Sequence, residues 1–328
     1  MSIDLKIEQN IPLASLTTFK IGGPAKYFIE VKTKDELLEA LTWAKKNKEQ
    51  PFILAGGSNV LINDNGINGL VIKICNDNIV VRGERIECGA GADLNKIVRL
   101  AINNNLSGLE WAIGIPRATV GGAVRGNAGA FGHSMQQLVE TVEVYNIEKG
   151  QFYQFSNKDC QFAYKESIFK QNSLEKTGLI WQVILKLNQG SVNNIEDLIK
   201  KYLQYREQTQ PKLPSAGCVF KNVAIANLSE ANAPAFAKAT AGKNLANQAN
   251  KEGVVKGGKV GAGWIIDKCN LKGKTIGGAK VSLEHANFII NTGKATAEDV
   301  AMLISLIKQQ VRTKYNLQLQ EEIQYLGF

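Results

Sequence analysis

The sequence has few of the residues and segments on which secreted, membrane and zinc-binding proteins depend. Its five cysteines, Cys75, Cys88, Cys160, Cys218 and Cys269, form no CxxC pair, and the chain has only two histidines. Disulfides and zinc need paired cysteines or Cys/His clusters, so neither is expected and no metal site is predicted. No apolar run approaches the roughly 20 residues of a membrane span, and the start MSIDLKIEQN lacks a signal peptide's apolar stretch. We expect a soluble, cytoplasmic protein that does not contact the membrane.

Concentrated charge and the common nucleotide-binding motifs are also missing. The chain has 39 Lys and Arg against 30 Asp and Glu, a formal net charge of +9, but the basic residues form no long run and no aromatic residues are interleaved with them. This distribution disfavours nucleic-acid binding and suits an anionic small substrate or a nucleotide cofactor equally well. No GxGxxG or GxxxxGK[ST] spacing is present, so Rossmann and P-loop sites are not predicted.

The abundant residue is glycine, with 31 in the chain, many of them in doublets such as AGGSN and VGGAV. The doublets follow no fixed period, which excludes a repeat protein. The chain of 328 residues, 44% of them hydrophobic, is long enough for two or three domains.

Hydrophobic periodicity predicts a small α/β lobe followed by a larger α+β lobe. A strand at 25–31, a helix at 34–47 and a strand at 51–55 form a β-α-β unit that ends in a glycine turn. Strands at hairpin spacing follow at 69–74, 78–82 and 85–90. The next predicted elements are a helix at 92–105, strands at 140–147, 150–156 and 179–187, and a helix at 194–208.

Two prolines in TQPKLPSAG predict a domain boundary before the C-terminal part of the chain. From 223 to 250, Ala occupies ten of 28 positions, which we interpret as a partly helical surface insertion. Helices near 261–270 and 296–315 and a last strand at 319–327 complete the prediction.

Two glycine stretches are candidates for ligand binding. In AGGSN (55–59) a strand ends in two glycines, where backbone N–H groups can converge on a pyrophosphate, although a plain tight turn has the same pattern. In GIPRATVGGAVRGNAGAFG (114–132) six glycines allow the backbone to lie flat against a planar ligand. A flavin bound in a non-Rossmann manner is the leading interpretation.

The order of several motifs makes the chain resemble the UDP-N-acetylenolpyruvoylglucosamine reductases, in the shorter of that family's two types. The motifs are LTTFKIGGPA, LAGGSNVLINDNGINGLVI, GIPRATVGGAVRGNAGAFG, FAYKESIF, PSAGCVFKN, AGWIIDKCNLKGKTIGGAKVSLEHANFIIN and EEIQYLG. The resemblance implies an α+β fold with an FAD-binding lobe of the vanillyl-alcohol-oxidase (PCMH) type. Its two subdomains are expected at 1–75 and 76–207, and a C-terminal α+β substrate-binding domain at 208–328, with the Ala-rich insertion at about 223–258.

The resemblance also implies a reaction with FAD and NADPH as cofactors. NADPH reduces FAD, hydride passes to C3 of UDP-N-acetylglucosamine enolpyruvate, and an acid protonates C2, giving UDP-N-acetylmuramate for peptidoglycan synthesis. The expected partner is this small molecule, with no nucleic acid, and the expected state is a monomer. The alternatives are a flavin-dependent oxidoreductase of the same fold with another substrate, or a basic nucleotide- or RNA-binding protein.

Three residues match the family's catalytic positions. Cys218 stands where the family usually has a proton-donating serine; a thiol is the stronger acid, with a typical pKa of about 8.5. The alternative for this cysteine is a buried filler. Glu322 matches a C-terminal glutamate, and on a strand its neighbour Glu321 would point to the opposite face. Lys165 stands where the family has an arginine, so a compact ammonium charge replaces a planar guanidinium group. Lys170 is the alternative candidate for this cation.

The resemblance further assigns binding residues. Substrate contacts are expected at Tyr164, Asn222 and His285, the last with a structural histidine as its alternative. The expected FAD-binding residues are Gly56, Gly57, Ser58, Asn59, Val60, Gly114, Ile115, Pro116, Thr119, Gly121, Gly122, Asn127 and Gly129.

Overall fold

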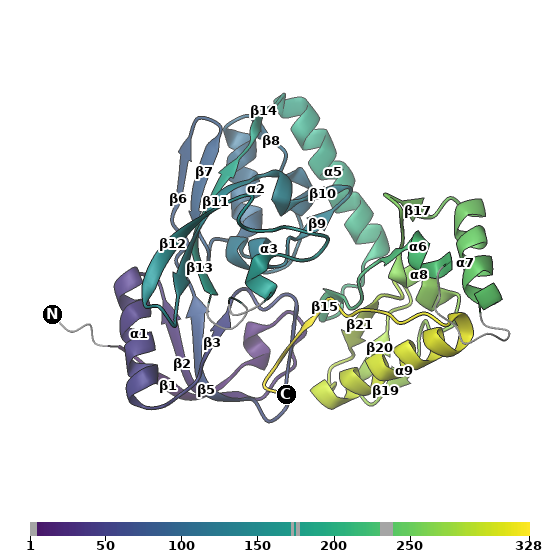
Figure 1. Ribbon diagram of the computed structural model, residues 1–328, viewed down its shortest axis with the longest axis horizontal. Helices are drawn as coiled ribbons and strands as arrows, with labels where there is room; N and C mark the ends of the chain where they lie inside the picture. Colours follow the sequence, from purple (N-terminus) through teal and green to yellow (C-terminus); the bar gives the residue numbers. More distant parts are fainter. Residues whose placement is uncertain (1–4, 172–173, 175–177, 230–238) are drawn as a thin grey trace. The chain divides into compact units, whose positions relative to one another are not determined.

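The chain folds into two compact units, shown in Figure 1. The computed structural model describes residues 5–171, 174, 178–229 and 239–328. Unit 1 is formed by 1–12, 24–57 and 67–208, and unit 2 by 13–23, 58–66 and 209–328. The first predicted subdomain is therefore not continuous, because 13–23 and 58–66 belong to unit 2. The division of the FAD-binding lobe near residue 75 stays a prediction.

The first sheet of unit 1 has the strand order β1-β2-β5-β3. Strands β2 (Pro24–Val31) and β3 (Pro51–Leu54) both run parallel to β5 (Ile67–Ile74), and β1 (Glu8–Pro12) is antiparallel to β2. Helix α1 (Lys34–Lys46) connects β2 to β3 and begins at a capping box formed by Thr33 and Glu36. The predicted β-α-β unit is confirmed, with β5 inserted between its two strands.

The second sheet of unit 1 is antiparallel, with the order β12-β11-β13-β7-β6. Its strands are β6 (Ile79–Arg82), β7 (Arg85–Gly89), β11 (Val139–Asn146), β12 (Gln151–Ser156) and β13 (Gly178–Lys186). The expected β6–β7 hairpin is present, but the expected pairing of 69–74 with 78–82 is wrong, because β5 lies in the first sheet.

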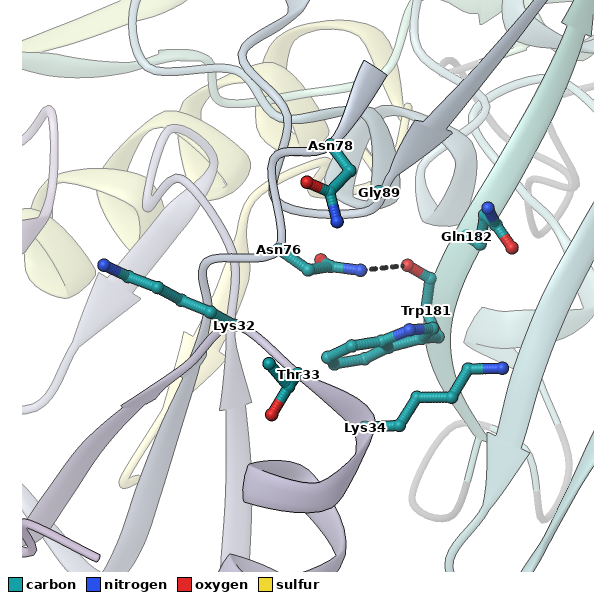
Figure 2. Close-up of a pocket in the computed structure, with 8 residues that line it drawn as sticks. All are labelled: Lys32, Thr33, Lys34, Asn76, Asn78, Gly89, Trp181 and Gln182. Carbon is teal, nitrogen blue, oxygen red and sulfur yellow. Dashed lines mark hydrogen bonds between the residues drawn. The ribbon is translucent and has the colours of Figure 1, made fainter. Parts of the chain in front are cut away.

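A buried asparagine holds the chain where it passes from the first sheet to the second. The Asn76 side chain donates to the Trp181 carbonyl at 2.6 Å (Figure 2) and accepts from the Gly91 N–H at 3.0 Å. Because both halves of this amide are satisfied, its burial carries no unpaired polar group. The crossing at Asn76 explains why hairpin spacing did not produce a hairpin here.

The remaining elements of unit 1 cover the sheets. Residues of both sheets and of α1, α2 and α3 contribute to one continuous hydrophobic core. These further elements are α2 (Leu94–Asn103), α3 (Val120–Arg125), α5 (Val192–Thr209), the strand pairs β8 (Leu106–Ser107) with β14 (Asn188–Gln189) and β9 (Gly129–Ala130) with β10 (His133–Ser134), and the 3₁₀ turns at Glu110–Ala112, Met135–Gln137 and Ile168–Lys170.

Unit 2 is built on an antiparallel sheet with the order β15-β21-β20-β19. Its strands are β15 (Ser215–Cys218), β19 (Thr275–Ile276), β20 (Ala279–Val281) and β21 (Phe288–Asn291). Helix α9 (Ala297–Tyr315) packs against β19 and β20. Neither α9 nor any other helix in the described part of the chain is long and apolar enough to cross a membrane.

The contacts that join segment 58–66 to unit 2 include a strand pairing and a carboxylate at the start of α9. Strand β4 (Val60–Ile62) pairs in parallel with the C-terminal strand β22 (Gln324–Leu326). The Asp64 carboxylate accepts from the N–H groups of Ala297 and Glu298 at 2.8 and 3.2 Å, at the positive end of the α9 dipole. The last strand is shorter than the predicted 319–327, and an isolated bridge between Phe220 and Glu321 precedes it.

The Ala-rich region is partly helical, as expected, but its description as a surface insertion is wrong for the residues that the structure describes. The buried side chains Leu228, Leu245, Ala246 and Ala249 belong to the core of unit 2. The region's elements are β16 (Val223–Ala224), α6 (Ile225–Ser229), α7 (Ala239–Lys251), β17 (Val255–Lys256) and β18 (Lys259–Val260), and α8 (Ala262–Asp267) follows them. Unit 2 also contains the 3₁₀ turn Ala14–Leu16. The sequence did not reveal this buried face, because several of the buried residues are themselves alanines and do not stand out from the alanine-rich background. Residues 230–238 of the predicted insertion lie outside the described residues.

We expect Leu245→Ala to destabilise the protein by about 2 to 5 kcal/mol, since it removes a side chain that is only 2% exposed. Leu283→Ala is the matched control, because Leu283 is 60% exposed and its truncation should cost less than about 0.5 kcal/mol. Chemical denaturation of the FAD-loaded protein measures both. Equal effects of the two substitutions would show that α7 is not part of the core.

Candidate active site

The two predicted glycine stretches of unit 1 lie against each other. A Cβ atom on Gly56 would come within 1.6 Å of the Arg117 carbonyl oxygen, and one on Gly122 would contact the Ala55 Cβ at 3.4 Å. The Arg117 Nε donates to the Gly56 carbonyl at 3.3 Å. Only glycine at position 56 allows this approach of two backbones. The structure thus brings together stretches that are more than fifty residues apart in the sequence.

The backbone of 114–119 is shaped by an asparagine that the sequence did not reveal. The Asn95 side chain accepts from the Gly114 N–H at 2.7 Å and donates to the Ile115 carbonyl at 2.9 Å. Gly114 has φ = +79°, a conformation that favours glycine. Asn95 lies on a predicted helix, where its amide gives no signal that it contacts a loop.

Helix α3 starts in the middle of the second glycine stretch. Thr119 caps it by accepting from the Gly122 N–H at 3.4 Å, and Pro116 and Gly122 are exposed. Gly121, by contrast, is buried, and a Cβ there would lie 2.7 Å from the Ala90 Cβ. The need for glycine at 121 therefore comes from packing of the protein itself.

A tight turn presents Tyr164 and Lys165. Ala163 and Glu166 exchange backbone hydrogen bonds of 3.0 and 3.1 Å, and Lys165 at the tip has φ = +57°. The buried Asn127 holds this turn, because its side chain donates to the Ala163 carbonyl at 2.7 Å and accepts from the Gln136 N–H at 3.0 Å. The Asn127 amide thus has protein partners, and its predicted contact with FAD stays a prediction.

The structure separates the roles of the two candidate lysines. The Lys170 Nζ donates to the Lys165 carbonyl at 2.9 Å and lies 3.5 Å from the Glu166 carboxylate, so Lys170 supports the turn from beneath. The Lys165 Nζ reaches the Gly129 carbonyl at 3.4 Å, next to the second glycine stretch. Lys165 is therefore the cation presented by this turn.

In unit 2, Cys218 and Glu322 lie on neighbouring backbone segments. Cys218 pairs with Phe288 in the main sheet. On the other side of the same segment, the Glu322 N–H donates to the Val219 carbonyl at 2.7 Å and the Lys221 N–H donates to the Gln320 carbonyl at 2.8 Å. Both Cys218 and Glu322 are half-buried. This pairing places a thiol and a carboxylate in one region.

The choice between Glu321 and Glu322 has a geometric basis. The Glu321 carboxylate is 2.6 Å from the Lys308 Nζ on α9, and a hydrogen bond to Glu321, after burial, contributes to raising the pKa of Tyr325. Glu321 therefore points towards the helix, and strand alternation predicts the opposite face for Glu322. The catalytic role of Glu322 stays a prediction.

Residues 58–60 contact the same C-terminal segment. The Asn59 Nδ2 donates to the Glu322 carbonyl at 3.1 Å, and the Gln324 N–H donates to the Asn59 carbonyl at 3.0 Å. Val60 pairs with Gln324 in the β4–β22 ladder. The end of the AGGSN stretch is thus fixed beside Glu322 within unit 2.

The predicted substrate residues Asn222 and His285 approach the start of α8 from two directions. The Asn222 Oδ1 accepts from the Ala262 N–H at 3.2 Å. A Cβ on Gly263 would lie 2.9 Å from the His285 Cε1. The His285 Nδ1 accepts from the Asn287 N–H at 3.2 Å, which assigns the ring proton to Nε2 when the imidazole is neutral. Burial lowers the pKa of His285, so the neutral form is favoured.

The pocket drawn in Figure 2 is separate from these residues. It lies in unit 1 and is lined by Lys32, Thr33, Lys34, Asn76, Asn78, Gly89, Trp181 and Gln182. None of the predicted site residues is among them. Within the described ranges, no group of three or more His, Cys, Asp or Glu side chains is arranged to hold a metal ion.

Both glycine stretches lie within a segment whose family match gives the class of protein, the flavin-binding oxidoreductases. Residues 25–156 match the family model described as FAD binding domain. The fold class is α+β with an FAD-binding unit of the vanillyl-alcohol-oxidase type, as the sequence predicted.

The particular family follows from the whole chain. Residues 209–326 match the model of the UDP-N-acetylenolpyruvoylglucosamine reductase C-terminal domain. The reductase of Solibacter usitatus is 34% identical over 325 residues, 99% of this chain and 98% of that protein. The reductase of Bacillus subtilis is 32% identical over 98% of this chain and 94% of that protein. The crystal structure of the Thermus caldophilus reductase superposes with a TM-score of 0.75 at 31% identity, covering 98% of this chain and 99% of that one. The chain belongs to the UDP-N-acetylenolpyruvoylglucosamine reductase family.

The residues of unit 1 fit FAD. Gly56, which cannot carry a side chain, lies against Arg117 and Thr119, next to Gly57 with φ = +68°, and the stretch around Thr119 includes the exposed residues Pro116 and Gly122. Small residues and exposed peptide groups suit a planar ring and a pyrophosphate. Arg117 supplies positive charge at the same place. These are the residues that would hold the cofactor.

We expect Gly56→Ala to be purified with much less FAD than the natural protein. The new methyl group would collide with the Arg117 carbonyl, so the two glycine stretches would have to separate. Gly126→Ala is the control, because Gly126 has φ = −85° and its Cβ would meet its nearest neighbour at 3.5 Å. Flavin absorbance per mole of folded protein measures the effect. Full flavin content in Gly56→Ala would contradict the assignment.

His285 gives an expectation for stability at low pH. In the unfolded chain its pKa is near 6.5, whereas burial lowers it in the folded protein. Below about pH 6.5 the unfolded chain therefore binds more protons, and this contribution to stability is lost as the pH falls. His285→Gln should lose less Tm between about pH 7.5 and 5.5 than the natural protein.

The other histidine supplies the control for this measurement. His133 is exposed, so His133→Gln should lose as much Tm as the natural protein. If His285→Gln and His133→Gln lost the same amount, the folded protein would not be protecting the neutral imidazole of His285.

Proposed function

We propose that this protein is the FAD-dependent reductase that converts UDP-N-acetylglucosamine enolpyruvate to UDP-N-acetylmuramate with NADPH, a step of peptidoglycan precursor synthesis. One observation carries the assignment of its catalytic residues: Glu322 N–H binds the Val219 carbonyl at 2.7 Å, which sets Glu322 beside the strand that ends in Cys218. The membership of the whole chain in the reductase family supplies the substrate.

The chemistry of the substrate defines what the residues must do. When bound, FAD accepts two electrons from NADPH and supplies the hydride that adds to C3 of the enolpyruvyl group. Addition of hydride at C3 places negative charge on C2 and the adjoining carboxylate. The protein must stabilise this charge and then deliver one proton.

Cys218 is the proposed proton donor. Its S–H bond breaks as the C2–H bond forms, and the resulting thiolate regains a proton from water, so one NADPH and one proton are consumed per substrate. An ordinary thiol has a pKa of about 8.5 and is mostly protonated at neutral pH. A thiol is therefore a sufficient replacement for the family's usual serine hydroxyl.

Lys165 and Glu322 are proposed to orient the substrate carboxylate and polarise the enol. Lys165 offers a point charge that makes fewer directional hydrogen bonds than an arginine fork. The backbone around it compensates, because Asn127 and Lys170 both fix the turn that carries it. Tyr164, 39% exposed on the same turn, and Asn222 and His285 in unit 2 are the proposed substrate contacts.

We also propose that the protein acts as a monomer in the cytoplasm. The proposed substrate and NADPH are charged nucleotides, which do not cross a lipid bilayer unaided.

The test is NADPH oxidation that requires UDP-N-acetylglucosamine enolpyruvate. We expect Cys218→Ala to slow reoxidation of the reduced flavin by substrate about 10²- to 10⁴-fold, because general acid catalysis contributes this much. Reduction of the flavin by NADPH should be unchanged, and Cys218→Ser should retain measurable turnover. Stopped-flow absorbance separates the two half-reactions.

Cys269→Ala is the control for the effect of removing a thiol, because Cys269 is half-buried in unit 2 at the end of α8 and matches none of the family's catalytic positions. Normal turnover of Cys218→Ala would show that Cys218 only fills space in the packing and is not the proton donor. An FAD-loaded protein whose NADPH oxidation ignores the substrate would refute the proposed function.

A further inference from the structure

One buried side chain binds the backbone directly after the proposed proton donor. Asn287 is 2% exposed and precedes β21. Its Nδ2 donates to the Phe220 carbonyl at 2.8 Å, and its Oδ1 accepts from the Phe220 N–H at 2.9 Å. Its own carbonyl accepts from the Val219 N–H at 2.8 Å. Three hydrogen bonds from one residue thus fix the two residues that follow Cys218.

The Asn287 side chain takes the place of a missing strand. The β15–β21 ladder pairs Cys218 with Phe288, and the chain before Phe288 turns away through His285. Without a side-chain amide, the Phe220 peptide groups would have no strand partner on this side. An asparagine amide offers a donor and an acceptor side by side, as a backbone strand would.

The three hydrogen bonds of Asn287, which we call the Asn287 clamp, lie opposite the segment that carries Glu322. Val219 donates its N–H to Asn287 and accepts from the Glu322 N–H with its carbonyl. The short stretch between Cys218 and Lys221 is therefore held from both sides. A shift of this stretch would move the Cys218 thiol and the Glu322 carboxylate together.

Asn287 also acts on His285. Its backbone N–H donates to the His285 Nδ1 at 3.2 Å, which leaves the Nε2–H as the group that can donate to a ligand. One residue thus contacts both the segment of the proposed acid and a proposed substrate-binding imidazole.

We propose that Asn287 is a positioning residue that holds the Cys218 thiol in line for proton transfer to C2. This inference rests on the proposed function. In this role Asn287 acts through the backbone of Val219 and Phe220. A misplacement of about 1 Å can cost on the order of 10²-fold in rate, so loss of the clamp should appear in the proton-transfer step.

The test is Asn287→Asp, assayed as the FAD-loaded full chain. The substitution keeps the shape but replaces the N–H donor with an oxygen that faces the Phe220 carbonyl. We expect reoxidation of the reduced flavin by substrate to slow about 10- to 100-fold, with flavin reduction by NADPH unchanged. The solvent deuterium isotope effect on reoxidation should rise, because proton transfer becomes rate-limiting.

Asn291→Asp is the matched control. Asn291 lies on β21, is 4% exposed, and donates to the carbonyls of Phe19 and Lys20 at 3.1 and 3.3 Å while accepting from Gly293 and Ala295. The same chemical change there disturbs the core of unit 2 but not the Cys218 segment. It should lower stability without raising the isotope effect.

A double substitution separates positioning from a general structural role. In a Cys218→Ala background no thiol remains to be positioned, so adding Asn287→Asp should slow reoxidation by less than about twofold more. If Asn287→Asp is purified without FAD, Asn287→Ser is assayed in the same way and against the same criteria.

The inference is overturned by an unchanged isotope effect, by equal slowing of both half-reactions, or by full additivity with Cys218→Ala. These results differ from failure of the proposed function, in which the natural protein itself would show no substrate-dependent oxidation of NADPH.

Discussion

The candidate chemistry of unit 2 depends on the backbone pairing between Val219 and Glu322. This hydrogen bond, 2.7 Å long, joins residues about a hundred positions apart in the sequence. It fixes the separation of the two segments, and strand alternation predicts that Glu322 faces away from α9. A side-chain contact alone could not do this, because long side chains rotate about several bonds. The thiol and the carboxylate are placed by backbone, and their side chains need to adjust only locally.

Helix α9 supports this pairing at two points along its length. At its N-terminus Asp64 accepts from two helix N–H groups and holds segment 58–66. Further along, Lys308 binds the Glu321 carboxylate at 2.6 Å. The ion pair is partly exposed, so its contribution to stability is modest. Its consequence is orientation, since it directs the Glu321 side chain towards α9. One helix therefore aligns Asn59 and Glu322, which meet at 3.1 Å.

Much of the fold could be predicted from the sequence because hydrophobic periodicity is local. The predicted strand at 25–31 and helix at 34–47 appear as β2 and α1. The parallel insertion of β5 and the transfer of 58–66 to unit 2 could not be predicted, because parallel pairing links distant segments and leaves no local pattern.

The parts of the candidate site that lie within recognisable sequence motifs could be predicted. The glycine stretches do meet, and Cys218 and Glu322 do lie on paired segments. The sequence did not reveal Asn95 or Asn287, since an asparagine in a loop or on a helix face resembles any solvated amide. The core position of Leu245 was missed because alanine-rich composition masks a buried face.

Four buried or partly buried asparagines share one physical role in this protein. Asn76, Asn95, Asn127 and Asn287 each use the side-chain amide as donor and acceptor to backbone groups of other segments. Aspartate is a poor replacement, because it offers no N–H when ionised and so loses the hydrogen bond to the carbonyl. Glutamine would reach too far by one methylene. Side-chain amides therefore hold irregular backbone segments of the candidate site in place, much as a neighbouring strand would. For this reason segments with little hydrophobic periodicity in the sequence can still be precisely placed in the fold.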